Sequence, residues 1–525
     1  MDRGADAGEA SVPEPIGGQN ALPHLVFRPL LLIVGIAGTL LGARSGRYPW
    51  FGDELYFQSA GRRLSFGYVD QGPLVPLLAR VFARIAPDSL VAQRLPVVCC
   101  AVATIWVCAL TAREFGGGWS AQVTAALAYA ATPFLVTSAA SLCTFAFDAL
   151  LSALLLWIMV RWTRIRQHRW LLAAALVAAV DLQVKLLLPV LGCGILLGAA
   201  IVGPRQLFRT PMAWAAAVLV AAAAAPGLWW QSRHGWPQVA MGPVIAAEQG
   251  AATGGATGLP VQEILLLGLP GTVLAIVGLW ALLNCSSWRA YRFVVVAVLV
   301  QSAFVLFTVS RPYYLAGLFP VLIAAGAVRM VGRERPRWAE ATGGALLAAS
   351  VTFSGALVFV LPMAHSALRE PVHDRADLSA RIRLYGMDGG PELIAAVRSA
   401  AATLGLGERG RAVVITQNYW QAALLDQPSA ELPPVYSPDR GFGYLGVPPE
   451  SATTVLYVGA ASAEPMLWRT FRTVEPLARL DDPLGFPGLT RNAVIWRCDD
   501  PRRPWARTWP GLRTLDLDPG LEDPR

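Results

Sequence analysis

The sequence predicts a mainly α-helical, polytopic membrane protein with about eleven transmembrane helices and a small α/β domain at its C-terminal end. Of its 525 residues, 55% are hydrophobic and 15% are charged, whereas a soluble protein has about a quarter charged residues. Apolar runs of about 20 residues, the length that crosses the hydrocarbon core of a bilayer, recur along most of the chain. The net charge of +8 resides in arginines of short loops, which indicates membrane topology rather than nucleic-acid binding.

The predicted elements follow in order along the chain. Residues 1–24 are polar and are expected to be disordered. The transmembrane domain covers residues 25–361 and contains a long first external loop at 42–88. Its spans are predicted at 25–41, 90–112, 121–139, 147–162, 170–179, 186–202, 211–229, 263–283, 293–310, 314–331 and 342–361.

The arginines predict the orientation of these spans. Four separate arginine-bearing loops fall on one side of the membrane, at residues 161–169, 205–209, 289–292 and 329–337. The positive-inside rule assigns this side to the cytoplasm. The N-terminus is then cytoplasmic, whereas the first loop and the region after residue 361 are extracytoplasmic.

A short pair of predicted helices, residues 170–202, contains Lys185, the single lysine of the chain. About 33 residues are few for two crossings and a turn, so the turn is expected below the outer surface, lining a cavity or buried in protein. Asp181, Gln183 and Lys185 occupy this turn, and ionisable groups at such depth are candidates for function. The alternative is that Lys185 extends its amine to the interface or only forms an ion pair with Asp181.

The first external loop, YPWFGDELYFQSAGRRLSFGYVDQGPLVPLLARVFARI, combines aromatic residues with the acids Asp53, Glu54 and Asp70. Its apolar residues recur with helical spacing at 54–66 and 77–85, which predicts two amphipathic helices on the membrane surface. Acidic side chains at the water–lipid boundary, next to cationic ones, are suited to a reaction on a phosphate-linked lipid. An ordinary interfacial loop is the alternative.

Two further groups of candidate site residues are predicted at the same face of the membrane. Asp148 lies near the start of a predicted helix, where it either serves in the site or caps the helix through its carboxylate. Arg311, beside Tyr313 and Tyr314, can bind a phosphate through charge-assisted hydrogen bonds. Alternatively, this cluster is an aromatic belt with an arginine anchor.

These motifs carry a resemblance to a known group of enzymes. FGDELYFQSAGRRLSFGYVDQGPLVPL, TFAFDALL, VKLLLPVLG and RPYYLAGLFP, with the later segments ITQNYWQAALLD, LPPVYSPDRGFGYLGVPP and TTVLYVG, resemble bacterial GT-C membrane glycosyltransferases of family 39. That superfamily includes protein O-mannosyltransferases and the aminoarabinose transferase that acts on lipid A. The resemblance implies a multi-pass protein of the bacterial inner membrane. It also implies a hexosyl- or pentosyltransferase that takes a sugar from polyprenyl monophosphate and acts at the outer face.

The resemblance also implies roles for single residues. Asp53 matches the acid thought to be the catalytic base, with Glu54 as its neighbour, and Asp148 matches a second functionally important acid. Lipid A-type members have a lysine after the loop acid, where this chain has Gln71 after Asp70. Phosphate binding is therefore assigned to Lys185, Arg311, Tyr313 and Tyr314, and substrate binding to Tyr68, Asp70 and Gln71.

Several alternatives stay open at this point. The acceptor is a lipid, glycan or protein hydroxyl, and an acidic pair can also hold Mg²⁺ or Mn²⁺. The seven cysteines and five histidines show no zinc-binding spacing. A transporter that uses Asp181 and Lys185 as a coupling pair, and a ligase or polymerase of lipid-linked oligosaccharides, are the competing functions.

The extracytoplasmic C-terminal domain, residues 362–525, is predicted to be small and α/β. RAVVIT, TTVLYVGA and NAVIWRC are typical of strands, and residues 391–404 are typical of a helix. No nucleophile or metal-binding constellation is apparent in it, so it is expected to shape access of the acceptor. The final residues, rich in proline and arginine, are expected to be loosely ordered.

Overall fold

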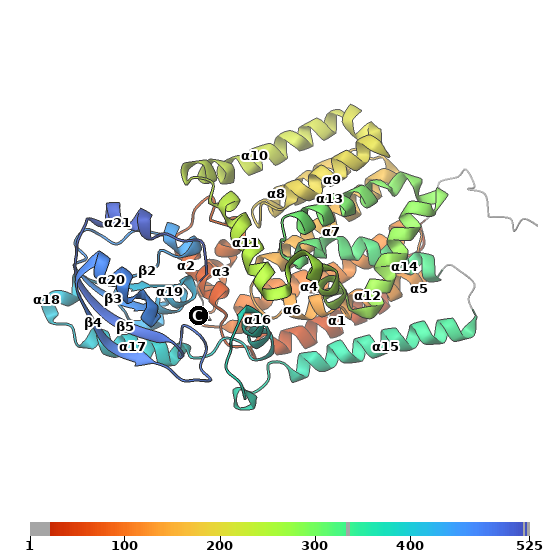
Figure 1. Cartoon of the computed structure of the whole chain (residues 1–525). Coiled ribbons are helices and arrows are strands. Elements are labelled where there is room, and N and C mark those ends of the chain that lie inside the picture. The colour runs from red at the N-terminus through yellow and green to blue at the C-terminus, as the bar shows by residue number, and fades with distance from the viewer. Residues whose placement is uncertain (1–21, 332–335, 518–519, 522–525) are drawn as a thin grey trace, which may run out of the picture.

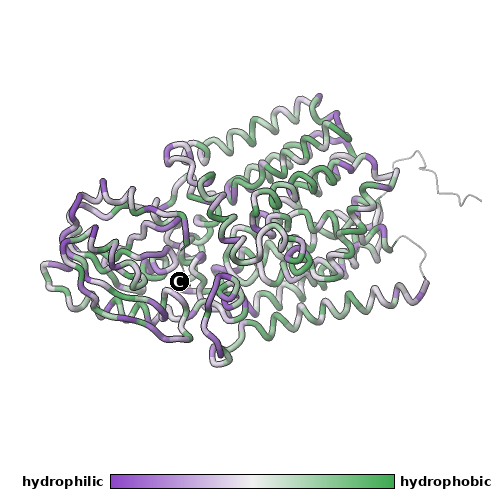
Figure 2. Tube along the Cα trace, viewed as in Figure 1, coloured by the Kyte–Doolittle hydropathy of each residue, from purple (hydrophilic) through white to green (hydrophobic). Residues whose placement is uncertain are grey.

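A computed structural model of the chain describes residues 22–331, 336–517 and 520–521. A bundle of long helices forms one part of the molecule, and a mixed sheet with short helices covers one end of the bundle (Figure 1). Figure 2 shows that the middles of the long helices are hydrophobic, whereas hydrophilic segments gather at their ends. Most of the predicted disordered segment, up to residue 21, lies outside the described residues.

Within the described residues, seven stretches of helix are long and apolar enough to cross a membrane. They are α1 (Phe27–Arg44), α4 (Leu90–Glu114), α7 (Thr144–Ile165), α10 (Pro211–Arg233), α12 (Leu259–Asn284), α14 (Phe319–Val331) together with the preceding turn η4 (Pro312–Leu318), and α15 (Arg337–Val360). The remaining predicted spans correspond to shorter helices: α5 (Trp119–Ala130), α8 (Arg169–Asp181), α9 (Leu188–Ile201) and α13 (Phe293–Phe307). The predicted helical membrane fold is thereby confirmed.

The predicted span at 121–139 is not one helix. Helix α5 ends at Ala130, and α6 (Pro133–Ser138) begins after a break in which the Thr132 side chain accepts a hydrogen bond from the Leu135 amide. Pro133 lacks an N–H and therefore starts the new helix instead of continuing the old one.

The segment between α10 and α12 contains a further helix that the sequence patterns did not indicate. Helix α11 (Pro237–Thr253) begins after Gly235 and Trp236, which both have positive φ. Pro237 occupies its first turn, where proline is tolerated. Because Pro243 and two glycines, Gly242 and Gly250, interrupt its apolar pattern, the sequence here is also compatible with a loop.

The first loop contains α2 (Gly52–Arg62) and α3 (Leu74–Ile85), as its amphipathic pattern predicts. Between them, the loop contacts the turn that joins α8 and α9: the amides of Gly72 and Leu74 donate hydrogen bonds to the carbonyls of Val184 and Gln183, both at 2.9 Å. A Cβ at position 72 would lie 2.2 Å from the Gln183 oxygen. Glycine is therefore required there, and this contact places the loop against Lys185.

The sheet after α15 has the strand order β2-β1-β3-β5-β4. Strand β1 (Ala412–Thr416) is parallel to β2 (Val435–Tyr436) and β3 (Thr454–Gly459), whereas β5 (Ala493–Pro501) is antiparallel to β3 and β4 (Phe471–Leu480). Helix α17 (Gly390–Ala402) agrees with its prediction. In the part of the expected loose C-terminal end that the structure describes, α21 (Trp505–Leu512) is anchored by the buried Trp505 and Trp509. Residues 518–519 and 522–525 of this segment lie outside the described residues.

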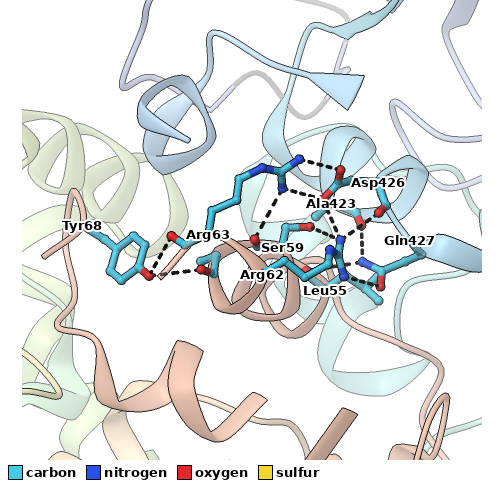
Figure 3. Close-up of polar contacts among 9 residues, drawn as sticks. Leu55, Ser59, Arg62, Arg63, Tyr68, Ala423, Asp426 and Gln427 are labelled. Carbon is cyan, nitrogen blue, oxygen red and sulfur yellow. Dashed lines mark hydrogen bonds and ion pairs between the residues drawn. The ribbon is translucent and has the colours of Figure 1, made fainter. Parts of the chain in front are cut away.

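Helix α2 docks onto α19 (Tyr419–Leu425), which follows β1. Arg62 and Arg63 of α2 both form ion pairs with Asp426 at the end of α19, at 2.6 and 2.8 Å (Figure 3). A Cβ on Gly52 would lie 2.2 Å from the Trp420 ring, so glycine permits the close approach. The first loop and the C-terminal region consequently share one hydrophobic core.

Candidate active site

A cavity of about 300 Å³ lies where the first loop, the bundle and the C-terminal region meet. Its lining includes Asp53, Asp70 and Gln71 from the first loop and Lys185 from the α8–α9 turn. Most of the residues predicted to act in the site therefore face one common space. The other predicted residues in its lining are Arg311, Tyr313 and Tyr314.

Asp53 lies in the first turn of α2 and is held by the C-terminal region. Its Oδ1 accepts hydrogen bonds from the Tyr419 hydroxyl at 2.6 Å and from the Trp420 ring N–H at 2.9 Å. Among the described residues, Oδ2 accepts no such bond. Burial raises the pKa of the Asp53 carboxyl above its usual range, while the Tyr419 and Trp420 hydrogen bonds oppose this shift. Asp53 is thus a positioned carboxylate with one oxygen available and an elevated basicity.

Lys185 is buried, 8% exposed, and its Nζ lies 4.5 Å from the centre of the Tyr314 ring. This is the distance of a cation–π contact. In the part of the chain that the structure describes, no carboxylate forms an ion pair with it, and both side-chain oxygens of Asp181 lack a hydrogen-bond partner. The Asp181–Lys185 ion pair, which the sequence left open as an alternative, is therefore not formed among the described residues. The lysine amine lies in the cavity wall beside aromatic rings, so it can meet an anion there.

Glu248, an acidic residue of α11, forms ion pairs with arginines of the cavity. It bonds Arg311 at 2.6 Å and Arg440 at a short distance, and Arg375 lies 3.8 Å away. The cavity-lining residues of α11 are Met241, Ile245, Glu248 and Ala252, spaced by three or four positions, which places them on one face of the helix. Arg311, predicted to bind phosphate, thus already has an internal carboxylate partner.

Two buried acids, Asp148 and Asp181, are not part of the cavity lining. Asp148 is in the second turn of α7, which begins at Thr144 with Cys143 as its N-cap, so Asp148 does not cap the helix as the alternative held. Asp148 and Asp181 are 4% and 0% exposed. Their charges interact with each other, and that of Asp148 interacts with Lys185. Asp148 is therefore placed to influence the charge of the lysine from outside the cavity lining.

Glu54, predicted to act beside Asp53, is absent from the cavity lining. It is fully buried and forms a two-point contact with Arg94 at 2.8 and 2.7 Å. Its carboxylate also accepts hydrogen bonds from the amides of Phe51 and Leu142. Neighbouring positions on a helix point about 100° apart, so α2 directs Asp53 to the cavity and Glu54 into the bundle.

Tyr68, predicted to bind substrate, is likewise outside the cavity lining. Its hydroxyl donates a hydrogen bond to the Ala60 carbonyl and accepts one from the Ser65 amide. The side chain is 2% exposed. It therefore closes the C-terminal end of α2 onto the loop that follows.

The C-terminal region contributes residues that sequence reasoning did not find, namely Tyr419, Trp420 and Arg440. The feature of the sequence that could have indicated this position is Asn418, a residue typical of helix N-caps. Its side chain caps α19 by accepting a hydrogen bond from the Gln421 amide. This cap directs the Tyr419–Trp420 pair towards the first loop. A Cβ on Gly441 would lie 2.0 Å from the Tyr56 hydroxyl. The absence of a side chain at Gly441 therefore lets the segment that bears Arg440 lie close to α2.

The acids of the cavity do not form an evident metal site. Among the described residues, no group of three or more His, Cys, Asp or Glu side chains is arranged to share an ion. Asp53 is engaged by Tyr419 and Trp420, and Glu248 by arginines. The residues present therefore do not fit a metal held by several protein carboxylates.

Comparison with known proteins supports this architecture. Residues 70–230 match the family described as dolichyl-phosphate-mannose-protein mannosyltransferase. This segment contains Asp70, Asp148 and Lys185, but not Asp53 or the C-terminal region. No curated protein matches the chain in sequence.

Solved structures resemble nearly the whole chain. ArnT from Cupriavidus metallidurans in the apo state is similar with a TM-score of 0.60 and 13% identity, over 89% of this chain and 97% of that one. ArnT bound to undecaprenyl phosphate is similar with a TM-score of 0.57 and 15% identity, over the same shares. The arabinofuranosyltransferase AftD from Mycobacteria is similar with a TM-score of 0.53 and 15% identity, over 92% of this chain and 41% of that one. The fold is therefore of the GT-C type, and the predicted resemblance is confirmed.

Proposed function

We propose that the chain transfers a sugar from a polyprenyl-monophosphate-linked donor to a hydroxyl acceptor at the extracytoplasmic face of the membrane. The observation that carries this proposal is that Asp53 and Lys185 line one cavity. The cavity lies at the end of the bundle next to the C-terminal region. Support comes from the matching family, which is named for a lipid-phosphate-linked sugar. It also comes from the ArnT structure with bound undecaprenyl phosphate.

Asp53 acts as the general base in this reaction. Its carboxylate takes the proton of the acceptor hydroxyl as that oxygen bonds to the anomeric carbon. At the same time, the bond between the anomeric carbon and the phosphate oxygen breaks, and polyprenyl phosphate leaves with the electron pair. The raised pKa of Asp53 suits this task because it brings the base closer to neutral pH. Tyr419 and Trp420 hold Oδ1 and act as positioning residues.

Lys185 stabilises the charge that develops on the departing phosphate. It is the stronger candidate because Arg311 and Arg440 are already bound to Glu248, whereas Lys185 contacts an aromatic ring. Tyr313 and Tyr314 would contribute hydroxyl groups from the same wall of the cavity. Asp70 and Gln71 of the first loop would contact the sugar or the acceptor.

The proposal is tested with the full chain in nanodiscs and synthetic polyprenyl-phosphate sugars that carry a radiolabel. Transfer to an added acceptor mixture is expected, and Asp53→Asn should reduce its rate by about 10²–10⁴-fold. A transporter gives no product, and a ligase uses lipid-linked oligosaccharide in place of the monosaccharide donor. Lys185→Met should weaken donor binding while the unfolding temperature is retained.

The matched control is Asp88→Asn in the same loop. Asp88 is exposed and has positive φ, a conformation that asparagine tolerates, so this variant should keep full activity. Product formation at the wild-type rate by Asp53→Asn would refute the role of the base. Donor binding at wild-type strength by Lys185→Met would refute the role of the lysine.

A further inference from the structure

A second hollow, which we call the distal pocket, is lined by four arginines: Arg166, Arg205, Arg289 and Arg292. It has a volume of about 530 Å³, and Gln206 and Ile201 belong to the same lining. The arginines come from three places in the chain: the end of α7, the connection between α9 and α10, and the connection between α12 and α13. Segments far apart in sequence thus bring their charges to one point.

The distal pocket lies at the opposite end of the bundle from the active-site cavity. Helix α7 begins at Thr144, which lines the cavity, and runs for 22 residues to Ile165, directly before Arg166. At 1.5 Å per residue this is about 33 Å, the thickness of a bilayer core. A lipid or ion bound here therefore cannot touch the site around Asp53.

The arginines of the distal pocket have no acidic partners among the described residues, in contrast to their neighbours. Arg161 and Arg164 both bond Glu114, the latter at 2.8 Å. None of the four pocket arginines forms such a pair in residues 22–331, 336–517 or 520–521. Their charges therefore add to a strongly positive potential in one hollow.

Two nitrogens of the pocket arginines also lack acceptors. The Nη1 of Arg166 and the Nε of Arg292 are buried without a hydrogen-bond partner in the described part of the chain. An N–H group buried in this way costs about 1–3 kcal/mol, and more when it is charged. Arg205, by contrast, donates to the carbonyls of Ala200 and Ile201 at the end of α9. The unmet donors of Arg166 and Arg292 point to an anionic ligand that supplies several acceptor oxygens.

We propose that the distal pocket binds the phosphate headgroup of an anionic membrane lipid. Guanidinium groups match phosphate oxygens in geometry and charge. Basic pockets between transmembrane helices are suited to such headgroups. This inference is independent of the proposed sugar transfer, since the pocket and the active site share no residue.

A lipid fits better than a soluble phosphate because the pocket has an apolar edge. Ile201 and Val202 line it and are 56% and 39% exposed, and Leu197, one turn earlier on α9, is 44% exposed. These exposed apolar side chains at the C-terminal end of α9 can contact acyl chains. A soluble phosphate would use the arginines but gain nothing from this edge.

The test uses the full chain in nanodiscs of phosphatidylcholine with an increasing fraction of phosphatidylglycerol. Native mass spectrometry then counts the phosphatidylglycerol molecules that remain bound after release from the nanodisc. The wild type is expected to retain phosphatidylglycerol, and Arg166→Gln/Arg292→Gln is expected to lower its apparent affinity about tenfold. The single variant Arg289→Gln, at an exposed position, should lower it severalfold and guards against loss of folding in the double variant.

Arg209→Gln is the matched control, because Arg209 is an exposed arginine at the same end of the bundle that does not line the pocket. Its lipid retention should equal that of the wild type. Retention unchanged in both pocket variants would overturn the proposal. Displacement of phosphatidylglycerol by glycerol 3-phosphate or inorganic phosphate at equal concentration would also overturn it, since the ligand would then be a soluble anion.

Discussion

The active-site cavity and the distal pocket are both lined by arginines, but the two sites differ in whether the protein itself supplies the carboxylate partner. In the cavity, Arg311 and Arg440 bond Glu248, a residue of the chain itself. In the distal pocket, the described residues supply no carboxylate to the four arginines. An internal partner holds guanidinium groups in place before a substrate arrives, and a ligand must compete for them. Arginines without such a partner provide more binding energy to an anion, which suits a lipid that stays bound.

The largest effect is expected when Glu248 is changed to glutamine. This variant removes the internal anion, so Arg311 and Arg440 should bind a phosphate more strongly. The loss of one competing charge-assisted bond is worth about 1.5 kcal/mol, and undecaprenyl phosphate should therefore bind about tenfold more tightly. Binding of undecaprenyl phosphate to the full chain in detergent measures this effect.

The control for this variant is Glu340→Gln, at an exposed position on α15 far along the chain from the cavity. It should leave the affinity unchanged. Weaker binding of undecaprenyl phosphate to Glu248→Gln would show that the ion pairs serve to hold α11 against the C-terminal region. The internal carboxylate of the cavity would then stabilise the structure without lowering the affinity of the cavity for a phosphate.

The sequence predicted the helical membrane fold because that fold depends on local pattern. Apolar length located the helices, and the shortness of residues 170–202 placed Lys185 inside the protein. The contact of Gly72 with the Gln183 carbonyl then brings the first loop to that turn. An inference from helix length alone was thus enough to associate Lys185 with a cavity.

Sequence reasoning failed where contacts join distant segments. Asp53 and Tyr419 are separated by 366 positions, and no local pattern connects them. Glu54 was assigned with Asp53 because the two are adjacent, yet Arg94 takes Glu54 into the bundle. Glu248 was missed because prolines and glycines in α11 obscure its helical period. In each case the partner that decides the role lies on another element.

The hydrogen bond from Tyr419 connects the basicity of Asp53 to the C-terminal region. Burial raises the pKa of Asp53, and the Tyr419 hydroxyl lowers it. In Tyr419→Phe the pKa should rise further, so the base becomes protonated at a higher pH. The acid limb of kcat/KM against pH should therefore move upward, with a severalfold loss of activity on the acid side and little change at alkaline pH.

Tyr444→Phe is the control, since Tyr444 does not line the cavity and its ring contact with Arg513 does not need the hydroxyl. Its pH profile should match that of the wild type. If the acid limb of Tyr419→Phe stays in place or moves downward, the hydroxyl does not tune the base. The C-terminal region would then shape the cavity without acting on Asp53.

The smallest expected effect comes from giving the distal pocket the internal acid that it lacks. Gln206 lines the pocket and is exposed, so Gln206→Glu would place a carboxylate among the four arginines, much as Glu248 lies among those of the cavity. Because the new charge is near solvent, its ion pairs are worth only about 0.2–1 kcal/mol. Retention of phosphatidylglycerol should then fall by roughly threefold in the nanodisc assay. Gln167→Glu, an exposed position at the same end of α7 outside the pocket lining, should leave retention unchanged. Equal losses in both variants would mean that the overall charge of this face, and not the built pocket, attracts the lipid.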